Sequence, residues 1–178
     1  YHIGQDMVKS GRVAAGLLAP YVEGAEVLVV TGNREFTAHG LRVRGFLDRL
    51  HEIFGVGINA NVIESVEQYD LTYDGVLQQV RNNPRLRGIY MANESVRGCM
   101  DALERAKPTR RVHVVCHDLT PHARQYLEEG RLDFIIDQDF SAQTARAIEV
   151  LAHTLRTGEP PRQDIEYIHT SIITRELL

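Results

Sequence analysis

Polar side chains follow several apolar, β-rich runs of this sequence, at the points where the runs end. These residues are Gly32, Asn33, Tyr69, Asp70, Asn93, Glu94, Asp118 and Gln138. Ligands of open α/β sheets bind beyond the carboxyl ends of the strands, so we expect a binding site among these side chains. The set is rich in carboxylate and amide groups, which donate and accept hydrogen bonds, and it contains few general bases. This composition favours binding of a polar ligand over acid–base catalysis.

Two other clusters of reactive residue types have structural explanations. His113, His117 and His122 suggest a metal site, but no carboxylate or cysteine at a suitable spacing completes it. Cys116 and His117 are adjacent on a predicted strand, so their side chains point to opposite faces and cannot form a nucleophile and its base.

Asp133 and Asp137 suggest an acid–base pair, but we interpret them as the flanks of the buried run 134–136. The segment 31–34 lacks the glycine spacing of a phosphate-binding loop. We therefore predict no catalytic residue, no metal and no cofactor.

Short apolar runs alternate with longer amphipathic stretches, which is typical of βαβ units and a parallel sheet. The predicted strands are 27–31, 61–66, 88–92, 112–116 and 134–136. The predicted helices are 7–18, 41–53, 71–80, 95–103, 122–127 and 141–155. The tail, 165–174, is rich in Ile and Thr and predicts one or two further strands. We expect an α/β fold with a parallel β-sheet flanked by helices on both faces.

Composition narrows the classes of function. The 178 residues carry a formal charge of -4, whereas a nucleic-acid-binding module usually presents a basic face. No apolar run is long enough to span a bilayer. Cys99 and Cys116 lack metal-ligand spacing and are predicted to be buried free thiols, which favours a cytoplasmic location.

Several segments, taken in order, resemble the type I periplasmic binding protein fold as it occurs in LacI-type transcriptional regulators and in sugar transport receptors. They are Ile3-Gly-Gln-Asp6 with Ser10-Gly-Arg-Val-Ala-Ala15, Leu41-Arg-Val-Arg-Gly-Phe46, Gly88-Ile-Tyr-Met-Ala-Asn93, Val114-Val-Cys-His-Asp118, Leu132 to Asp139, and Leu155-Arg-Thr-Gly-Glu-Pro-Pro161. His117 stands where the family usually has Phe, and Cys116 where it has Gly. This variant is more similar to certain LacI-type regulators than to transport receptors.

The resemblance implies the residues of a ligand site. Arg42, Asn93, Asp118 and Gln138 match ligand-binding positions of the family, and Tyr69 lies near the position of an aromatic or polar contact. Asp, Arg, Asn and Gln together match the donors and acceptors of a sugar's vicinal hydroxyls.

Each of these residues also has a structural alternative. Arg42 suits a solvated helix face, Asn93 and Asp118 suit helix caps, and Gln138 suits a plain strand end. The resemblance further implies that Asp6 and Gln138 lie at hinge segments between two lobes.

The resemblance also implies the domain organisation. Residues 1–138 correspond to the C-terminal lobe of a sugar-binding clamp, and residues 139–178 cross back to an N-terminal lobe that is largely missing here and add a closing strand. The helix near 141–155 carries an apolar face of Ala145, Ile148, Leu151 and Leu155. We expect that face to drive self-association or to pack in a way unlike the family.

The resulting prediction is the effector-binding lobe of a LacI-type regulator, not an enzyme. It would bind a sugar or polyol, form a homodimer, contact DNA only through a region absent from this chain, and make no membrane contact. The alternative is a periplasmic sugar-binding receptor of an ABC transporter. A Rossmann-type sugar dehydrogenase is disfavoured because the phosphate-binding loop is missing.

Overall fold

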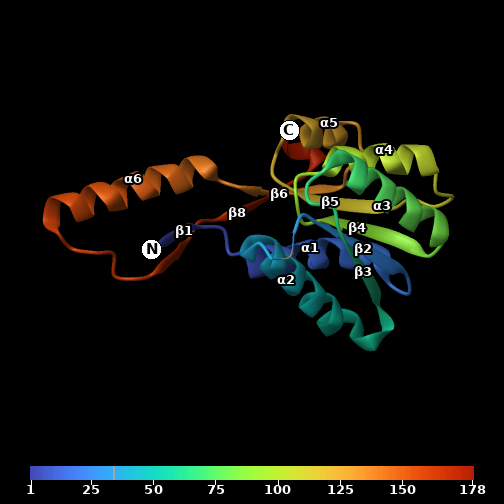
Figure 1. Cartoon of the computed structure of the whole chain (residues 1–178), viewed down its shortest axis with the longest axis horizontal. Helices are drawn as coiled ribbons and strands as arrows, with labels where there is room; N and C mark the ends of the chain where they lie inside the picture. The colour runs from blue at the N-terminus through green and yellow to red at the C-terminus, as the bar shows by residue number, and fades with distance from the viewer. Residues whose placement is uncertain (34) are drawn as a thin grey trace.

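The computed structural model describes residues 1–33 and 35–178. Most of the chain forms a layered α/β body, and two segments that are far apart in the sequence form an arm that projects from it (Figure 1). The arm contains strand β1 (His2–Gly4), helix α6 (Phe140–Thr157) and strand β7 (Ile165–Tyr167). β1 and β7 pair in parallel, so the arm joins the N-terminal strand to residues 165–167, whereas the C-terminus lies on the body beside α5 (Pro121–Glu128) (Figure 1).

A sheet of six strands lies at the centre of the body within the described residues. Across the sheet the strands are β3 (Asn59–Glu64), β2 (Glu26–Thr31), β4 (Leu86–Met91), β5 (His113–His117), β6 (Phe134–Gln138) and β8 (Thr170–Ile173). The first five run parallel, as the alternating pattern predicts. The tail supplies β8, which pairs antiparallel with β6, so one edge of the sheet departs from the parallel expectation.

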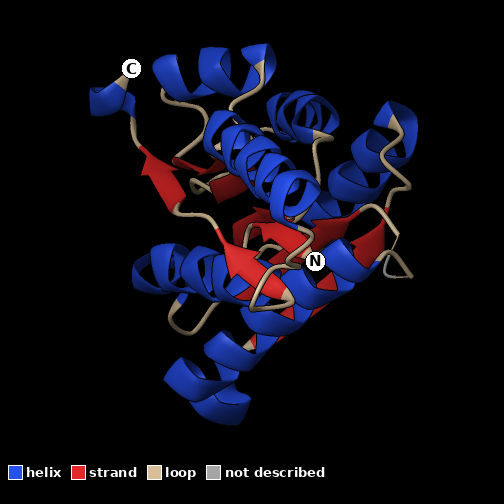
Figure 2. Cartoon of the chain, turned by 90° about the vertical axis from the view of Figure 1, so that its left-hand side faces the viewer, coloured by secondary structure: helices blue, strands red, loops and turns tan. Residues whose placement is uncertain are grey.

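Helices cover both faces of this sheet (Figure 2). One face carries α1 (Met7–Val22) and α2 (Thr37–Phe54). The other carries α3 (Tyr69–Asn82), α4 (Val96–Ala106) and α5 (Pro121–Glu128). Two short turns complete the elements, η1 (Gly55–Gly57) and η2 (Arg175–Leu177).

Each helical layer has its own apolar core. Along the strands, alternate side chains enter alternate cores, which explains why the central strands are almost continuously apolar. On the α1–α2 face the ring of Phe46 stacks on that of fully buried Tyr90, with the ring centroids 4.5 Å apart. The predicted α/β class with helices on both faces of the sheet is confirmed.

Helices α1 and α2 touch backbone to backbone. A Cβ atom added to Gly11 would lie 2.0 Å from the carbonyl oxygen of Arg42, and one added to Gly45 would lie 2.1 Å from that of Val8. Real Cβ atoms do not approach backbone this closely, so only glycine permits this crossing at either position. The close contact between α1 and α2 therefore fixes where the backbone of Arg42 lies relative to the sheet.

The chain passes between body and arm at three places, after Gly4, after Gln138 and after Tyr167. On the arm, the apolar face of α6 is largely exposed, with Ile148 62%, Leu151 60% and Leu155 78% accessible. That this face drives self-association stays a prediction. No helix within the described residues is long and apolar enough to cross a membrane.

The glycine crossing gives a stability test. Gly45→Ala should lower the free energy of unfolding by about 2 kcal/mol or more, because the methyl group must push the helices apart. Gly16, also in α1, has nothing within 4 Å of its added Cβ. As the matched control, Gly16→Ala should raise the free energy of unfolding by about 0.5 to 1 kcal/mol through helix propensity. Urea unfolding followed by circular dichroism measures both, and equal effects would contradict the close crossing.

Candidate functional site

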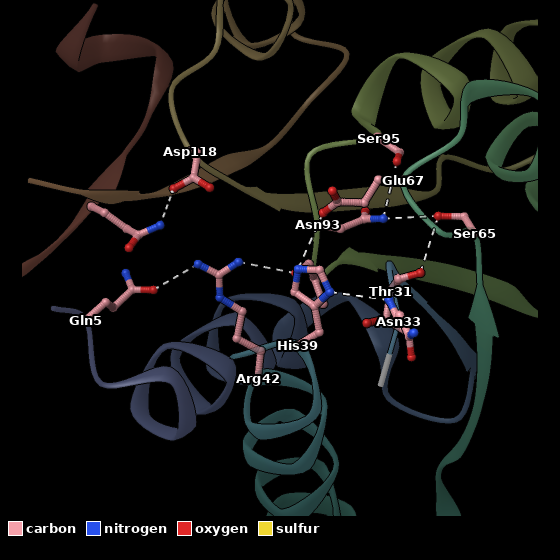
Figure 3. A network of polar contacts seen from close by, with 12 residues as sticks. Gln5, Thr31, Asn33, His39, Arg42, Ser65, Glu67, Asn93, Ser95 and Asp118 are labelled. Carbon is pink, nitrogen blue, oxygen red and sulfur yellow. Dashed lines mark hydrogen bonds and ion pairs between the residues drawn. The ribbon is translucent and has the colours of Figure 1, made fainter. Parts of the chain in front are cut away.

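The carboxyl ends of the parallel strands gather four of the five predicted ligand-binding residues at one edge of the body. Arg42, Asn93 and Asp118 lie there among buried polar groups (Figure 3), and Gln138 contacts Asp118. Each is placed by an element the sequence predicts: Arg42 by α2, and the other three by the ends of β4, β5 and β6.

Arg42 is held from two sides although it is 95% buried, with a relative exposure of 5%. Its Nη1 donates to the carbonyl oxygen of Ala92 over 3.3 Å, and its Nη2 donates to Oε1 of Gln5 over 3.2 Å. Its Nε has no hydrogen-bond partner. No carboxylate of a described residue lies within ion-pairing distance of Arg42, so its direct hydrogen-bond partners are both neutral oxygens.

Asp118 occupies a left-handed backbone conformation, with φ +65°, directly after β5. This conformation is uncommon outside glycine and is concentrated at functional sites. Nε2 of Gln138 donates to Oδ1 of Asp118 over 2.8 Å. Burial raises the pKa of the Asp118 carboxyl above its ordinary value, against the opposing effects of the Gln138 hydrogen bond and the Arg42 charge.

Asn93 is 1% exposed and links two neighbouring loops. Its Nδ2 donates to the Oγ of Ser65 over 3.0 Å and to the Oγ of Ser95 over 3.2 Å. Its Oδ1 accepts no hydrogen bond. Asn93 is therefore oriented by two serines and keeps one free acceptor.

Unpartnered buried polar atoms concentrate at this edge. Of seven such side-chain atoms in the described residues, five belong to residues at or beside the strand ends. These five are Gln5 Nε2, Thr31 Oγ1, Arg42 Nε, Asn93 Oδ1 and His117 Nδ1. A buried polar group without a hydrogen bond costs about 1–3 kcal/mol, and such a group requires an explanation in a native protein. A polar ligand at this edge would supply partners.

A hollow of about 460 Å³ opens beside Asp118 and Gln138, with Glu94, Thr120 and Ser171 also in its wall. The arm bears a larger hollow of about 640 Å³, along α6. There Arg146 and Glu166 already pair with each other over 2.7 Å. We favour the smaller hollow as the site because two of the predicted ligand-binding residues, Asp118 and Gln138, lie in its wall.

Tyr69 is not brought into this group. It begins α3, and its hydroxyl donates to Asp101 of α4 over 2.8 Å. Its ring stacks with Tyr73, and the guanidinium of Arg97 lies 5.4 Å from the ring centre. Asp6, the other predicted hinge residue, caps α1 by accepting from the backbone N–H of Lys9 over 2.9 Å, directly after the first crossing.

Sequence reasoning missed Gln5 and Ser65, although both directly follow strands. The same rule that selects Asn93 and Asp118 selects these two when it is applied to β1 and β3. A further missed pair is His39 and Glu67, which lie 3.4 Å apart beside the end of β2. Glu67 has a left-handed backbone conformation, with φ +56°.

The reactive clusters have structural partners. His117 is buried and bonds the hydroxyl of Tyr90 over 2.7 Å, and burial lowers the pKa of His117 well below its ordinary value, so the ring is neutral. Cys99 and Cys116 are buried free thiols, and burial raises the pKa of Cys99 to about 12. Among the described residues no group of three His, Cys, Asp or Glu could hold a metal ion.

The sheet of the body has helices on both faces, and the chain passes repeatedly from the body to the arm. Polar groups gather at the edge of the sheet where it does so. These features define the class of two-lobed α/β binding-protein folds. A family model described as a periplasmic binding protein domain matches residues 1–160, and the chain belongs to this family. A comparison with curated protein sequences finds no match.

Solved structures support the same fold. A glucose–galactose-binding protein, GanP, from Geobacillus stearothermophilus superposes with a TM-score of 0.86 at 21% identity, covering 98% of this chain and 62% of that one. A periplasmic ribose ABC transporter from Conexibacter woesei superposes with a TM-score of 0.87 at 20% identity, covering 98% of this chain and 59% of that one. A solute-binding protein from Actinobacillus succinogenes with bound D-allose superposes with a TM-score of 0.86 at 22% identity, covering 98% of this chain and 61% of that one. The chain thus spans less than two thirds of the length of these relatives.

The raised pKa of Asp118 predicts a pH dependence of stability. The folded state binds the Asp118 proton more tightly than the unfolded state, so Asp118 makes stability fall as pH rises from its ordinary pKa of 3.8 through the folded value. Asp118→Asn should remove this contribution, and its stability relative to the wild type should increase over that range. Urea unfolding between about pH 4 and about pH 7 measures the effect.

The matched control is Asp48→Asn, because Asp48 lies exposed on α2 in a surface pair with Arg44. The stability of this control should follow the wild type across the same pH range. Parallel curves of stability against pH for the wild type and Asp118→Asn would show that the pKa of the Asp118 carboxyl is not raised.

Proposed function

We propose that this chain is the ligand-binding lobe of a two-lobed clamp, and that it binds a sugar or polyol without catalysing a reaction. The observation that carries the proposal is the buried edge where Arg42, Asp118 and Gln138 lie together, with unpartnered polar atoms around them. Membership of the periplasmic binding protein family supports this proposal.

The chemistry of these side chains suits hydroxyl groups. Asp118 accepts from Gln138 through one oxygen, which leaves its other oxygen without a hydrogen bond among the described residues. That oxygen can accept a hydroxyl proton, the Nε–H of Arg42 can donate to a hydroxyl oxygen, and Oδ1 of Asn93 can accept. Adjacent donors and acceptors of this kind match the vicinal hydroxyls of a sugar.

For the whole protein, the solved relatives support a transport receptor. They include an ABC transporter periplasmic solute-binding protein with bound D-allose and a periplasmic ribose ABC transporter. In such a receptor, a ligand bound between two lobes stabilises the closed form by contacting both of them.

The second candidate is the effector-binding lobe of a LacI-type regulator, dimeric and cytoplasmic, with DNA bound by another region. The His117-Asp118 variant favours it, as do Cys99 and Cys116, since unpaired thiols suit a reducing compartment. The sequence of the full-length protein discriminates between the two candidates: a secretion signal would indicate the receptor, and a helix-turn-helix would indicate the regulator. Ligand-dependent binding to operator DNA in a gel-shift assay would decide for the regulator.

Thermal shift of the full-length protein tests ligand binding. D-ribose, D-allose, D-glucose and D-galactose form the first panel. A bound sugar at a hundred times its Kd should add about 2.7 kcal/mol of stability and raise the Tm. Asp118→Ala should abolish the shift in Tm, because it removes the carboxylate that would accept a hydrogen bond from a sugar hydroxyl.

Asp48→Ala is the matched control for this screen and should keep the full shift. A shift of equal size in Asp118→Ala would place the ligand elsewhere. No shift with any sugar or polyol would overturn the sugar proposal and direct the search to nucleosides, phosphorylated effectors or a protein partner.

A further inference from the structure

Two glutamines stand at crossings between body and arm, and each bonds one charged group of the site. Gln5 lies between β1 of the arm and α1 of the body, and its Oε1 accepts from the Arg42 guanidinium over 3.2 Å (Figure 3). Gln138 ends β6 before the chain enters the arm, and its Nε2 donates to Asp118 over 2.8 Å. The carbonyl end of one amide meets the cation, and the amino end of the other meets the anion.

We propose that Gln5 is a positioning residue that ties Arg42 to the first crossing, so that the orientation of the arm relative to the body sets the position of Arg42 and thereby ligand affinity. The inference rests on the proposed function for its consequence for affinity. The contact itself is a separate claim and can be tested without a ligand.

Burial makes this contact strong enough to position a side chain. Gln5 is 2% exposed and Arg42 is 5% exposed, so water competes little for their hydrogen bond. A hydrogen bond to a charged group is roughly twice as strong as one between neutral groups. Gln5 is the only described side chain that bonds Arg42, since the other partner is the backbone carbonyl of Ala92.

Contacts around Gln5 and Arg42 hold the neighbouring backbone in place, so a movement at the first crossing changes the hydrogen bond between the two side chains. Asp6 anchors the backbone after Gln5 to α1 through its bond to Lys9. Gly11 presses α1 against the Arg42 carbonyl, so the Arg42 backbone cannot follow the crossing. A turn of the arm therefore changes the Gln5–Arg42 geometry at the side-chain level.

Gln5 also has a hydrogen-bond donor that is available to a ligand. Its Nε2 is buried and has no hydrogen-bond partner, and the same is true of Nε of Arg42. Two unpartnered donors on bonded neighbours can both turn to one polar ligand. A ligand oxygen bound there would contact the guanidinium and the crossing together.

Arginine-specific modification tests the contact directly. In the full-length protein, phenylglyoxal should modify Arg42 slowly in the wild type because Arg42 is buried. Gln5→Leu and the milder Gln5→Asn should both raise the Arg42 rate several-fold, because Leu has no acceptor and Asn is one methylene too short to bring its carbonyl oxygen to Nη2. Gln5→Glu keeps an acceptor at the same reach and should restore protection. Peptide mass spectrometry measures each site.

The controls separate positioning from general loosening. Gln125, an exposed residue of α5 whose side chain bonds Glu129, provides the control variant Gln125→Leu, in which the Arg42 rate should equal that of the wild type. Arg44, 73% exposed in its side chain, should react equally in every variant. An unchanged Arg42 rate in Gln5→Leu and Gln5→Asn overturns the inference, as does an equal rise in Gln125→Leu.

Affinity for the panel sugars then tests the consequence. Gln5→Asn should raise the Kd of a sugar that binds the wild type by about tenfold, and Gln5→Glu should recover most of that loss. An unchanged Kd alongside a faster Arg42 rate overturns the link between crossing and affinity. If the wild type binds no panel sugar, the sugar proposal fails, while the modification rates still decide whether Gln5 positions Arg42.

Discussion

The contact between α1 and α2 determines where the Arg42 guanidinium can lie. Gly11 and Gly45 bring the two backbones so close that neither helix can slide or rotate without a clash. Below them, Phe46 is stacked on Tyr90, which fixes α2 to the central strand β4. Packing therefore places the backbone of Arg42, and the hydrogen bonds of its guanidinium set where that charged group lies. The helix that carries the main cation of the site is thus rigidly placed before a ligand arrives.

The strands supply the opposing groups through their register. Parallel pairing of β4, β5 and β6 brings the residues that follow them to one edge, although Asn93, Asp118 and Gln138 are widely spaced along the chain. The backbone of Asp118 turns into the left-handed region there, and this turn directs its carboxyl toward Gln138 instead of along the strand. The site thus combines a helix-borne donor with strand-borne acceptors on one rigid frame.

Much of this arrangement could be predicted from the sequence because local patterns encode it. Short apolar runs, several of them nearly continuous in Val and Ile, predict the five parallel strands, and the residues just after them include Asn93, Asp118 and Gln138. Arg42 came from a family resemblance, since a lone arginine on a helix carries no such signal. The antiparallel pairing of β8 and the side-chain direction of Tyr69 depend on tertiary contacts. Tyr69 bonds Asp101, a partner 32 residues away that no local pattern reveals.

Arg42 and Asp118, the two buried charged groups of the site, are each bonded by a neutral amide side chain and not by one another. Both are buried at the same edge, but each bonds a neutral partner and the two side chains make no direct ion pair. A direct buried pair would have to be broken to admit a ligand, which typically costs about 3–5 kcal/mol because it leaves an uncompensated charge. Held by Gln5 and Gln138 instead, the two charges keep open hydrogen-bonding positions, and a ligand can bridge them without first separating them. Burial raises the pKa of the Asp118 carboxyl because the charged form loses hydration there, and a hydroxyl donated by a ligand would replace part of that hydration.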